Sequence, residues 1–166
     1  YLDGGAGNDL MKGGSGNDIY IVDYFLDVVD EEGNADNADA VWSSLSIDLT
    51  AIGGGAIENA KLIGENTGGL LGHSFANVLI GNSAANLIDG GAGDVVMSGG
   101  AGTDIYTIDS AGDVIDEEGN KDSGDRVSSS VLSLNLKVIG GGALEHANLS
   151  GTADLDITGN DAQNLL

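Results

Sequence analysis

The chain has 166 residues, of which 29 are glycine and only 4% are aromatic. Its 27 acidic residues face five Lys and Arg residues, for a formal net charge of -22, so nucleic acid is not expected as a partner. The absence of cysteine and of any apolar run long enough to cross a bilayer argues against disulfides and a transmembrane segment. Because self-repulsion and chain entropy outweigh the burial available to so acidic a chain, cations are expected to supply part of its cohesion.

A period of nine residues opens the chain. The blocks GGAGNDLMK from Gly4 and GGSGNDIYI from Gly13 both carry an acidic residue at the sixth place. The period returns in two weaker blocks from Gly72 and then from Gly90 as GGAGDVVMS and GGAGTDIYT. Self-similarity at a fixed short period predicts a solenoid.

Very short strands are predicted after the turns, for example at residues 10–12 and 19–21, and no stretch of helical periodicity competes with them. Longer alternation of apolar residues occurs at 45–49 and again at 132–136. A period of two is typical of a half-buried strand, so these two segments are expected to form the widest rungs.

A longer repeat lies over the nonapeptides, because residues 3–44 match residues 89–130. From Leu45 the offset grows by one residue, and the extra residue, Val131, is interpreted as a β-bulge. The expected organisation is a single solenoid, 1–166, made of copy one, 1–88, and an incomplete copy two, 89–166.

The nonapeptides follow the pattern Gly-Gly-x-Gly-x-Asp-x-U-x, in which U is a large apolar residue, here Met11, Tyr20, Met97 or Tyr106. Three glycines allow six residues to curl so tightly that main-chain carbonyls point into one cavity. Calcium is a hard cation that takes six to eight oxygen ligands, more than one turn supplies. Each ion is therefore expected between turns two nonapeptides apart, bridged by carbonyls and by an aspartate from each turn.

With this pattern the chain resembles the repeats-in-toxin (RTX) family of calcium-binding nonapeptide repeats. The resemblance implies an all-β fold, a right-handed parallel β-roll (β-solenoid) whose short strands are joined by Gly-Asp turns. It also implies several bound calcium ions, export through a type I secretion channel, and folding in the extracellular space or at the cell surface.

A step of two nonapeptides brings Asp9 to Asp27, with Asp23 nearby. On the opposite edge it brings Asp18 to the longer loop that starts at Glu31. The predicted calcium ligands of these and the later turns are Gly4, Gly5, Gly7, Asp9, Gly13, Gly14, Gly16, Asp18, Asp23, Asp27, Asp39, Gly99, Gly100, Gly102, Asp104, Asp109, Asp113 and Asp125.

In the longer loop Asp39 is preferred to Asp36 as the ligand, because Asp39 directly precedes an expected strand. Asp125 holds the matching place in copy two and is paired with Asp104. Copy two departs from the pattern at Val95, which stands where copy one has Asp9. Since valine cannot coordinate calcium, the site shared by the Gly90 loop and Asp113 is predicted to be weak or empty.

Three blocks carry Asn77, Asn86 or Asn164 at the sixth place. A neutral amide favours a hydrogen-bonded ladder of turns without metal, with calcium binding as the alternative. The acidic runs 30–32 and 116–118 are interpreted as solvated loop charges rather than ligands.

No catalytic constellation is found in the sequence. Ser74 lies in an incomplete G-x-S-x-G pattern that its duplicate does not repeat, and His73 and His146 are expected to be surface turn residues. The favoured function is therefore a non-enzymatic calcium-binding module of a larger secreted protein, in contact with flanking repeats or domains. The alternatives are a repeat segment of an adhesin, filament or surface layer with possible self-assembly, and the C-terminal part of a secreted protease or lipase.

Overall fold

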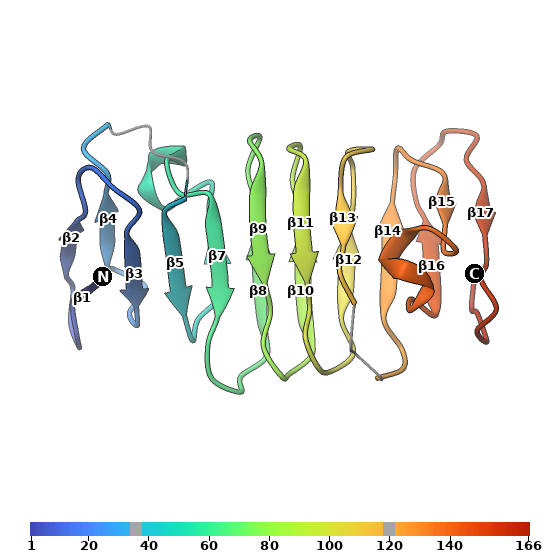
Figure 1. Ribbon diagram of the computed structural model, residues 1–166, viewed down its shortest axis with the longest axis horizontal. Coiled ribbons are helices and arrows are strands. Elements are labelled where there is room, and N and C mark those ends of the chain that lie inside the picture. Colours follow the sequence, from blue (N-terminus) through green and yellow to red (C-terminus); the bar gives the residue numbers. More distant parts are fainter. Residues whose placement is uncertain (34–37, 118–121) are drawn as a thin grey trace.

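The computed structural model describes residues 1–33, 38–117 and 122–166. Short strands in these residues alternate between two faces of an elongated stack, so that each coil of the chain adds one strand to each face (Figure 1). Asp36 and Glu118, both named above, lie outside the described residues.

The strands of the first face are β1 Leu2–Asp3, β3 Ile19–Val22, β5 Ala40–Ser43, β7 Asn59–Leu62, β9 Asn77–Ile80, β11 Val95–Ser98, β13 Val114–Ile115, β15 Leu134–Asn135 and β17 Ile157–Thr158. Those of the second face are β2 Leu10–Lys12, β4 Val28–Asp30, β6 Ile47–Asp48, β8 Gly68–Leu71, β10 Asn86–Asp89, β12 Ile105–Thr107, β14 Arg126–Ser129 and β16 His146–Leu149. Two short 3-10 turns, η1 Gly53–Gly55 and η2 Ile139–Gly142, lie in the longer connections.

Every strand pair is parallel and joins one coil to the next. β1, β3, β5, β7, β9, β11 and β13 form one continuous sheet, and β6, β8, β10, β12, β14 and β16 form another. Parallel strands whose order skips alternate elements define a solenoid, which confirms the predicted all-β parallel fold.

The core is a narrow column of inward side chains, and most strands contribute one or two of them. In the first sheet Tyr20 pairs in register with Val41, and Leu79 with Met97, all fully shielded from solvent. Met11 and Tyr106 point inward from the second face in the same way. The predicted U positions are therefore core positions, and further buried residues such as Val22 and Leu62 extend the core beyond them.

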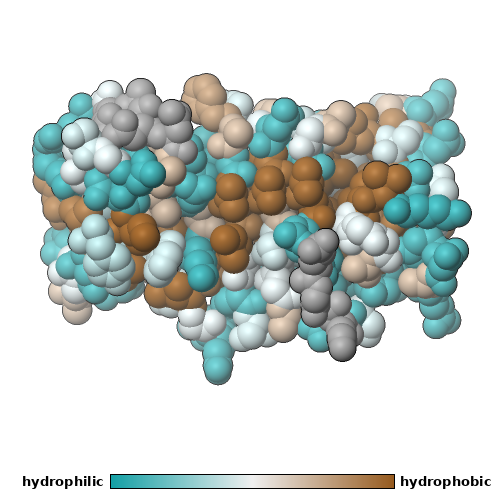
Figure 2. Space-filling view, viewed as in Figure 1, coloured by the Kyte–Doolittle hydropathy of each residue, from teal (hydrophilic) through white to brown (hydrophobic). Residues whose placement is uncertain are grey.

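Charge and apolar surface are separated on the outside of the solenoid. Figure 2 shows an apolar band across the middle of the molecule, where the exposed apolar residues of β9, β11 and β13 include Val78, Ile80, Val96 and Val114. No helix in the described part of the chain is long and apolar enough to cross a membrane.

The segments 45–49 and 132–136 lie in the coils with the most residues, but the strands in them, β6 and β15, have only two residues each. Contacts across these coils span 23 residues, against 18 in the simplest coils. The strands themselves are shorter than the alternation suggested, since Leu45 lies outside β6. Side-chain oxygens end the strand on both sides, because Ser43 Oγ accepts the Leu45 amide and Asp48 Oδ1 accepts the Thr50 amide, at 2.9 Å each.

The interpretation of Val131 as a β-bulge is wrong. Val131 is exposed in the bend after β14, where Ser129 Oγ accepts its amide at 3.3 Å and that of Leu132 at 3.0 Å. A bulge requires two paired strands, whereas here a serine-anchored turn absorbs the extra residue.

The two copies of the long repeat fall on opposite faces. β3, which carries Tyr20, lies in the first sheet, and its counterpart β12, which carries Tyr106, lies in the second. The long repeat thus contains an odd number of strands, and equivalent turns of the two copies lie on opposite edges.

Leu49→Ala should destabilise the fold strongly, because Leu49 is fully buried in a narrow apolar core. A cost of about 2–5 kcal/mol is expected, measured by urea unfolding in saturating calcium. Leu45→Ala is the matched control, since Leu45 is 39% exposed and should cost less than about 1 kcal/mol. Equal costs would contradict the packing described here.

Candidate metal centre

Each of these Gly-Asp turns is bonded to the coil that follows it. An aspartate carboxylate of the following coil accepts the main-chain amide of the sixth residue of the turn. The Asp18 amide donates to Asp39 Oδ1 at 2.8 Å, and the Asp9 amide donates to Asp27 Oδ1 at 3.1 Å. In copy two the Asp104 amide donates to Asp125 Oδ1 at 2.8 Å. The structure therefore brings together the aspartate pairs that the sequence predicted.

The aspartate of the shorter facing turn also closes its own loop. Asp27 Oδ2 accepts the amides of Asp23 and Tyr24 at 3.2 and 3.1 Å. Asp113 Oδ2 does the same for Asp109 and Ser110 in copy two, at 3.1 Å each. Asp23 and Asp109 thus contact the site through their main chain, and any role for their carboxylates stays a prediction.

Each motif glycine is required for a distinct reason. The first has no room for a side chain, since a Cβ on Gly4 would lie 2.5 Å from Asp9 Cβ and one on Gly13 would lie 2.6 Å from Asp18 Oδ2. The second and third have positive φ, which favours glycine. These φ values are 73°, 74° and 91° at Gly5, Gly14 and Gly100, and 135°, 115° and 118° at Gly7, Gly16 and Gly102.

Buried carboxylate oxygens in these turns lack a hydrogen-bond partner. They are Asp9 Oδ2, Glu31 Oε2 and Asp104 Oδ2. Burying an unpaired carboxylate is costly unless a cation or donor meets it. The donor set, hard carboxylate oxygens beside glycine-rich main chain, fits calcium.

Side chains alone do not complete such a site. Within residues 1–33, 38–117 and 122–166, no three His, Cys, Asp or Glu side chains form a group that would hold a metal ion. Main-chain carbonyls of the curled turns remain the predicted further ligands.

Burial and neighbouring negative charges raise the pKa of two of these aspartates. Burial, together with the nearby charges of Asp125 and Glu117, raises the pKa of Asp104 to about 7, although the hydrogen bond from the Asn86 amide lowers it. Burial likewise raises the pKa of Asp125 to about 6. The fold therefore holds carboxylates that are costly to ionise without a cation beside them.

Val95 makes the same main-chain hydrogen bond as Asp9 but has no carboxylate that could bind calcium. The Val95 amide donates to Asp113 Oδ1 at 3.0 Å, in the register that Asp9 and Asp27 use. The Val95 side chain is fully buried, where Asp9 would place a carboxylate. The prediction of a weak or empty site rests on this replacement.

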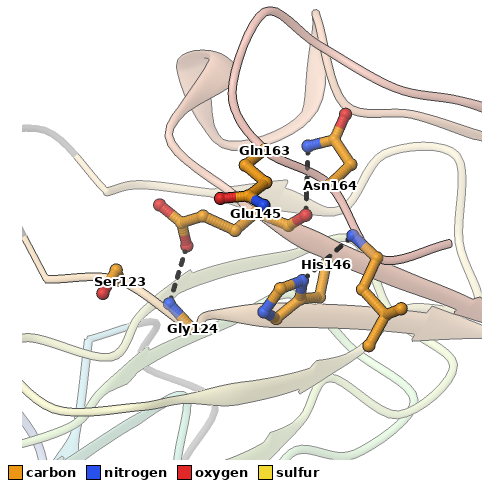
Figure 3. A pocket seen from close by; sticks show the side chains of 7 residues that line it. Ser123, Gly124, Glu145, His146, Gln163 and Asn164 are labelled. Atoms are coloured by element: carbon orange, nitrogen blue, oxygen red, sulfur yellow. Dashed lines mark hydrogen bonds between the residues drawn. The ribbon is translucent and has the colours of Figure 1, made fainter.

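The Asn-type turns form the predicted hydrogen-bonded ladder. Asn77 Oδ1 accepts the His73 amide at 2.8 Å, and its Nδ2 donates to the carbonyl of Glu58 in the preceding coil at 3.1 Å. Asn164 donates to the Glu145 carbonyl at 3.0 Å in the same way (Figure 3). Here an amide N–H joins neighbouring coils directly.

The interpretation of both acidic runs as wholly solvated is wrong. Glu31 is 2% exposed and Glu117 4% exposed, and they accept hydrogen bonds from the hydroxyls of Tyr20 and Tyr106. The sequence carried a signal for this, because Glu31 is two residues after the buried Val29 and so continues its inward alternation. Burial raises the pKa of Glu31, and the charges of neighbouring carboxylates add to this rise.

Two further glutamates contact the site, and the sequence analysis missed them. Glu58 Oε2 accepts the Asp39 amide at 3.1 Å. Glu145 Oε2 accepts the amides of Gly124 and Asp125, also at 3.1 Å (Figure 3). They follow the 3-10 turns, outside any nonapeptide, so the ninefold pattern could not identify them.

The expectation that His73 is a surface residue is wrong. His73 is 7% exposed, its Nε2 lies 3.0 Å from the Ile57 carbonyl oxygen, and its Nδ1 accepts the Phe75 amide at 3.2 Å. His73 therefore braces the connection after η1. His146 is half-buried, and its Nδ1 accepts the Leu165 amide at 3.2 Å.

Val95→Asp should create a calcium site between the Gly90 loop and Asp113. The variant is expected to bind one more calcium ion than the parent chain, measured by equilibrium dialysis with atomic absorption. Val95→Asn is the matched control, because an amide can form the hydrogen bonds of Asn86 without adding charge. An unchanged ion count for Val95→Asp would contradict the proposed ligand register.

The calcium-free chain should be more ordered at mildly acidic pH. Since the folded pKa of Asp104 is about 7 against about 3.9 in an unfolded chain, the folded state binds more protons between these values. Folding in excess chelator should therefore weaken as the pH rises from 5.5 to 8, followed by circular dichroism. Asp104→Asn should flatten this dependence, whereas the exposed Asp154→Asn should not.

Comparison with known protein families matches the RTX calcium-binding nonapeptide repeat, in four copies, to residues 1–22 and 71–115. No curated protein and no solved structure matches the chain. The matched segments contain the turns from Gly4, Gly13, Gly90 and Gly99 described above. RTX repeats bind calcium ions, and residues 1–22 and 71–115 are therefore identified as RTX calcium-binding nonapeptide repeats.

Proposed function

We propose that this β-roll is a folding module of a larger secreted protein, disordered at cytoplasmic calcium and ordered by extracellular calcium. The observation that carries the proposal is the burial of carboxylate oxygens without hydrogen-bond partners, Asp9 Oδ2 and Asp104 Oδ2 among them, in a chain of net charge -22. Each calcium ion offsets two negative charges and joins two coils. The free energy of metal binding is then free energy of folding.

Aspartate pairs are proposed as the side-chain ligands at each turn. One oxygen of Asp27, Asp39 or Asp125 accepts an amide from the preceding coil. Such a bond fixes the carboxylate so that its other oxygen can face an ion between the coils. Calcium affinity on the order of 10⁻⁴ to 10⁻³ M is expected, as in other extracellular modules.

Export unfolded and folding outside the cell are compatible with this coupling. Low calcium would keep the chain extended during passage through a type I secretion channel, and higher external calcium would then drive folding. RTX repeats bind calcium, and the proposal extends that property to the place where this chain folds.

A structural array is a second candidate function. The sheets run without interruption from copy one into copy two, since β10 pairs with β8 on one side and β12 on the other. Coils that stack through continuous sheets can be extended by further repeats, as in an adhesive stalk or surface layer. The number of long repeats in the parent protein distinguishes this role from that of a short module attached to an enzyme.

Calcium titration followed by far-ultraviolet circular dichroism tests the proposal. The chain should gain β structure cooperatively with calcium but not with magnesium, whose small octahedral shell suits these turns poorly. Asp18→Ala should shift the midpoint to higher calcium, whereas the exposed Asp154→Ala should leave it within error. Full β structure in excess chelator at neutral pH would refute calcium-coupled folding.

A further inference from the structure

Two clusters of carboxylates extend beyond the residues that match the RTX repeat. In copy one Glu31 and Asp39 approach Asp18, and in copy two Glu117 and Asp125 approach Asp104. The matched segments end at residues 22 and 115, so in each cluster they contain only the first aspartate. The glutamates come from longer turns that the nonapeptide pattern does not describe.

We propose that Glu31 and Glu117 become calcium ligands when an ion enters between the coils and draws them together with the Asp18/Asp39 and Asp104/Asp125 pairs, because without the ion no three acidic side chains in the described residues are grouped to hold a metal. Each of these sites then has three carboxylates. This inference rests on the proposed calcium-dependent folding. It implies two classes of site, because the Asp9/Asp27 pair has two carboxylates and lacks such a glutamate. More ligand charge gives higher calcium affinity, so the three-carboxylate sites fill first.

Burial of Glu31 is the first support. Its side chain is 2% exposed, yet Oε2 has no hydrogen-bond partner while Oε1 accepts the Tyr20 hydroxyl. A carboxylate oxygen so placed is stabilised by a cation that comes within coordination distance. Asp104 Oδ2 is a second buried oxygen without a partner, in the corresponding cluster of copy two.

The second observation that supports calcium binding by these glutamates is that the tyrosine hydroxyl and the aspartate carboxylate of each turn lie beside the same glycine. A Cβ on Gly13 would overlap Tyr20 Oη and lie 2.6 Å from Asp18 Oδ2, so both oxygens face the same glycine. A Cβ on Gly99 would overlap both Asp104 Oδ2 and Tyr106 Oη. The hydroxyl that holds the glutamate is therefore adjacent to the aspartate of the turn.

Tyrosine at the U position has a specific role in this arrangement. Tyr106 Oη accepts the Gly99 amide at 2.7 Å and donates to Glu117 Oε1. It thereby fixes one glutamate oxygen and the first glycine of the turn at once. Met11 and Met97 hold the same place in the turns that lack a buried glutamate, and they have no hydroxyl to donate.

A further pair of glutamates positions the second aspartate of each site. The Asp39 amide donates to Glu58 Oε2, and the Asp125 amide donates to Glu145 Oε2, at 3.1 Å in both cases. These bonds hold the long turn against the coil that follows. The same set of four carboxylates and a tyrosine thus occurs twice, on opposite edges of the solenoid.

Glu31→Gln and Glu117→Gln test the proposal. Glutamine keeps an oxygen that can accept the tyrosine hydroxyl but removes the charge, so packing is preserved. Glu32→Gln is the matched control, because Glu32 is the exposed neighbour of Glu31 and its carboxylate pairs with Lys12 instead. Calcium binding is measured by isothermal titration calorimetry, and folding by circular dichroism on the same samples.

Either buried substitution should weaken the tighter class of sites by at least about 10-fold, and the double variant should remove that class. Glu32→Gln should leave both classes unchanged. If Glu31→Gln and Glu117→Gln bind calcium like the parent chain, the glutamates are only hydrogen-bond partners of the tyrosines and the inference fails. If the parent chain itself shows no calcium dependence, the proposed function fails instead.

Discussion

The structure depends on carboxylates that bond to the main chain of the neighbouring coil while they stay out of water. Each such carboxylate accepts an amide one coil away, as Asp39 does from Asp18 and Asp113 from Val95. This bond sets the register between coils without any contribution from the apolar core. The same bonds place several carboxylates close together in the turns at the edges of the solenoid. Cations between the coils would lower the repulsion between these negative charges.

The apolar core is correspondingly small. One or two inward apolar side chains in most strands, for example Val41 or Leu79, fill the space between the two faces. Where a turn has Asn or Val in place of the aspartate at its sixth position, a hydrogen bond or an apolar contact joins the coils instead. Asn77 and Asn164 donate to carbonyls of the preceding coil, and Val95 extends the core into the turn.

Much of the fold could be predicted from the sequence because the ninefold spacing fixes which residues face inward and which turns stack. The pair Asp9/Asp27 followed from that spacing, and Asp39 was chosen as the partner of Asp18 because it directly precedes an expected strand; the structure confirms the proximity of both pairs. Burial of Glu31 and His73 was not predicted, because charged and polar side chains in loops are usually solvated. Their environment depends on connections whose path is set by tertiary contacts, to Tyr20 in one case and to Ile57 in the other.

The odd number of strands in the long repeat has a mechanical consequence. Equivalent acidic turns, at Asp39 and at Asp125, enter strands of opposite sheets. If ions drew coils together along one edge alone, that edge would shorten and the stack would curve toward it. Alternating the contraction between the two edges cancels the bend, so the rod can tighten along its axis while it remains straight.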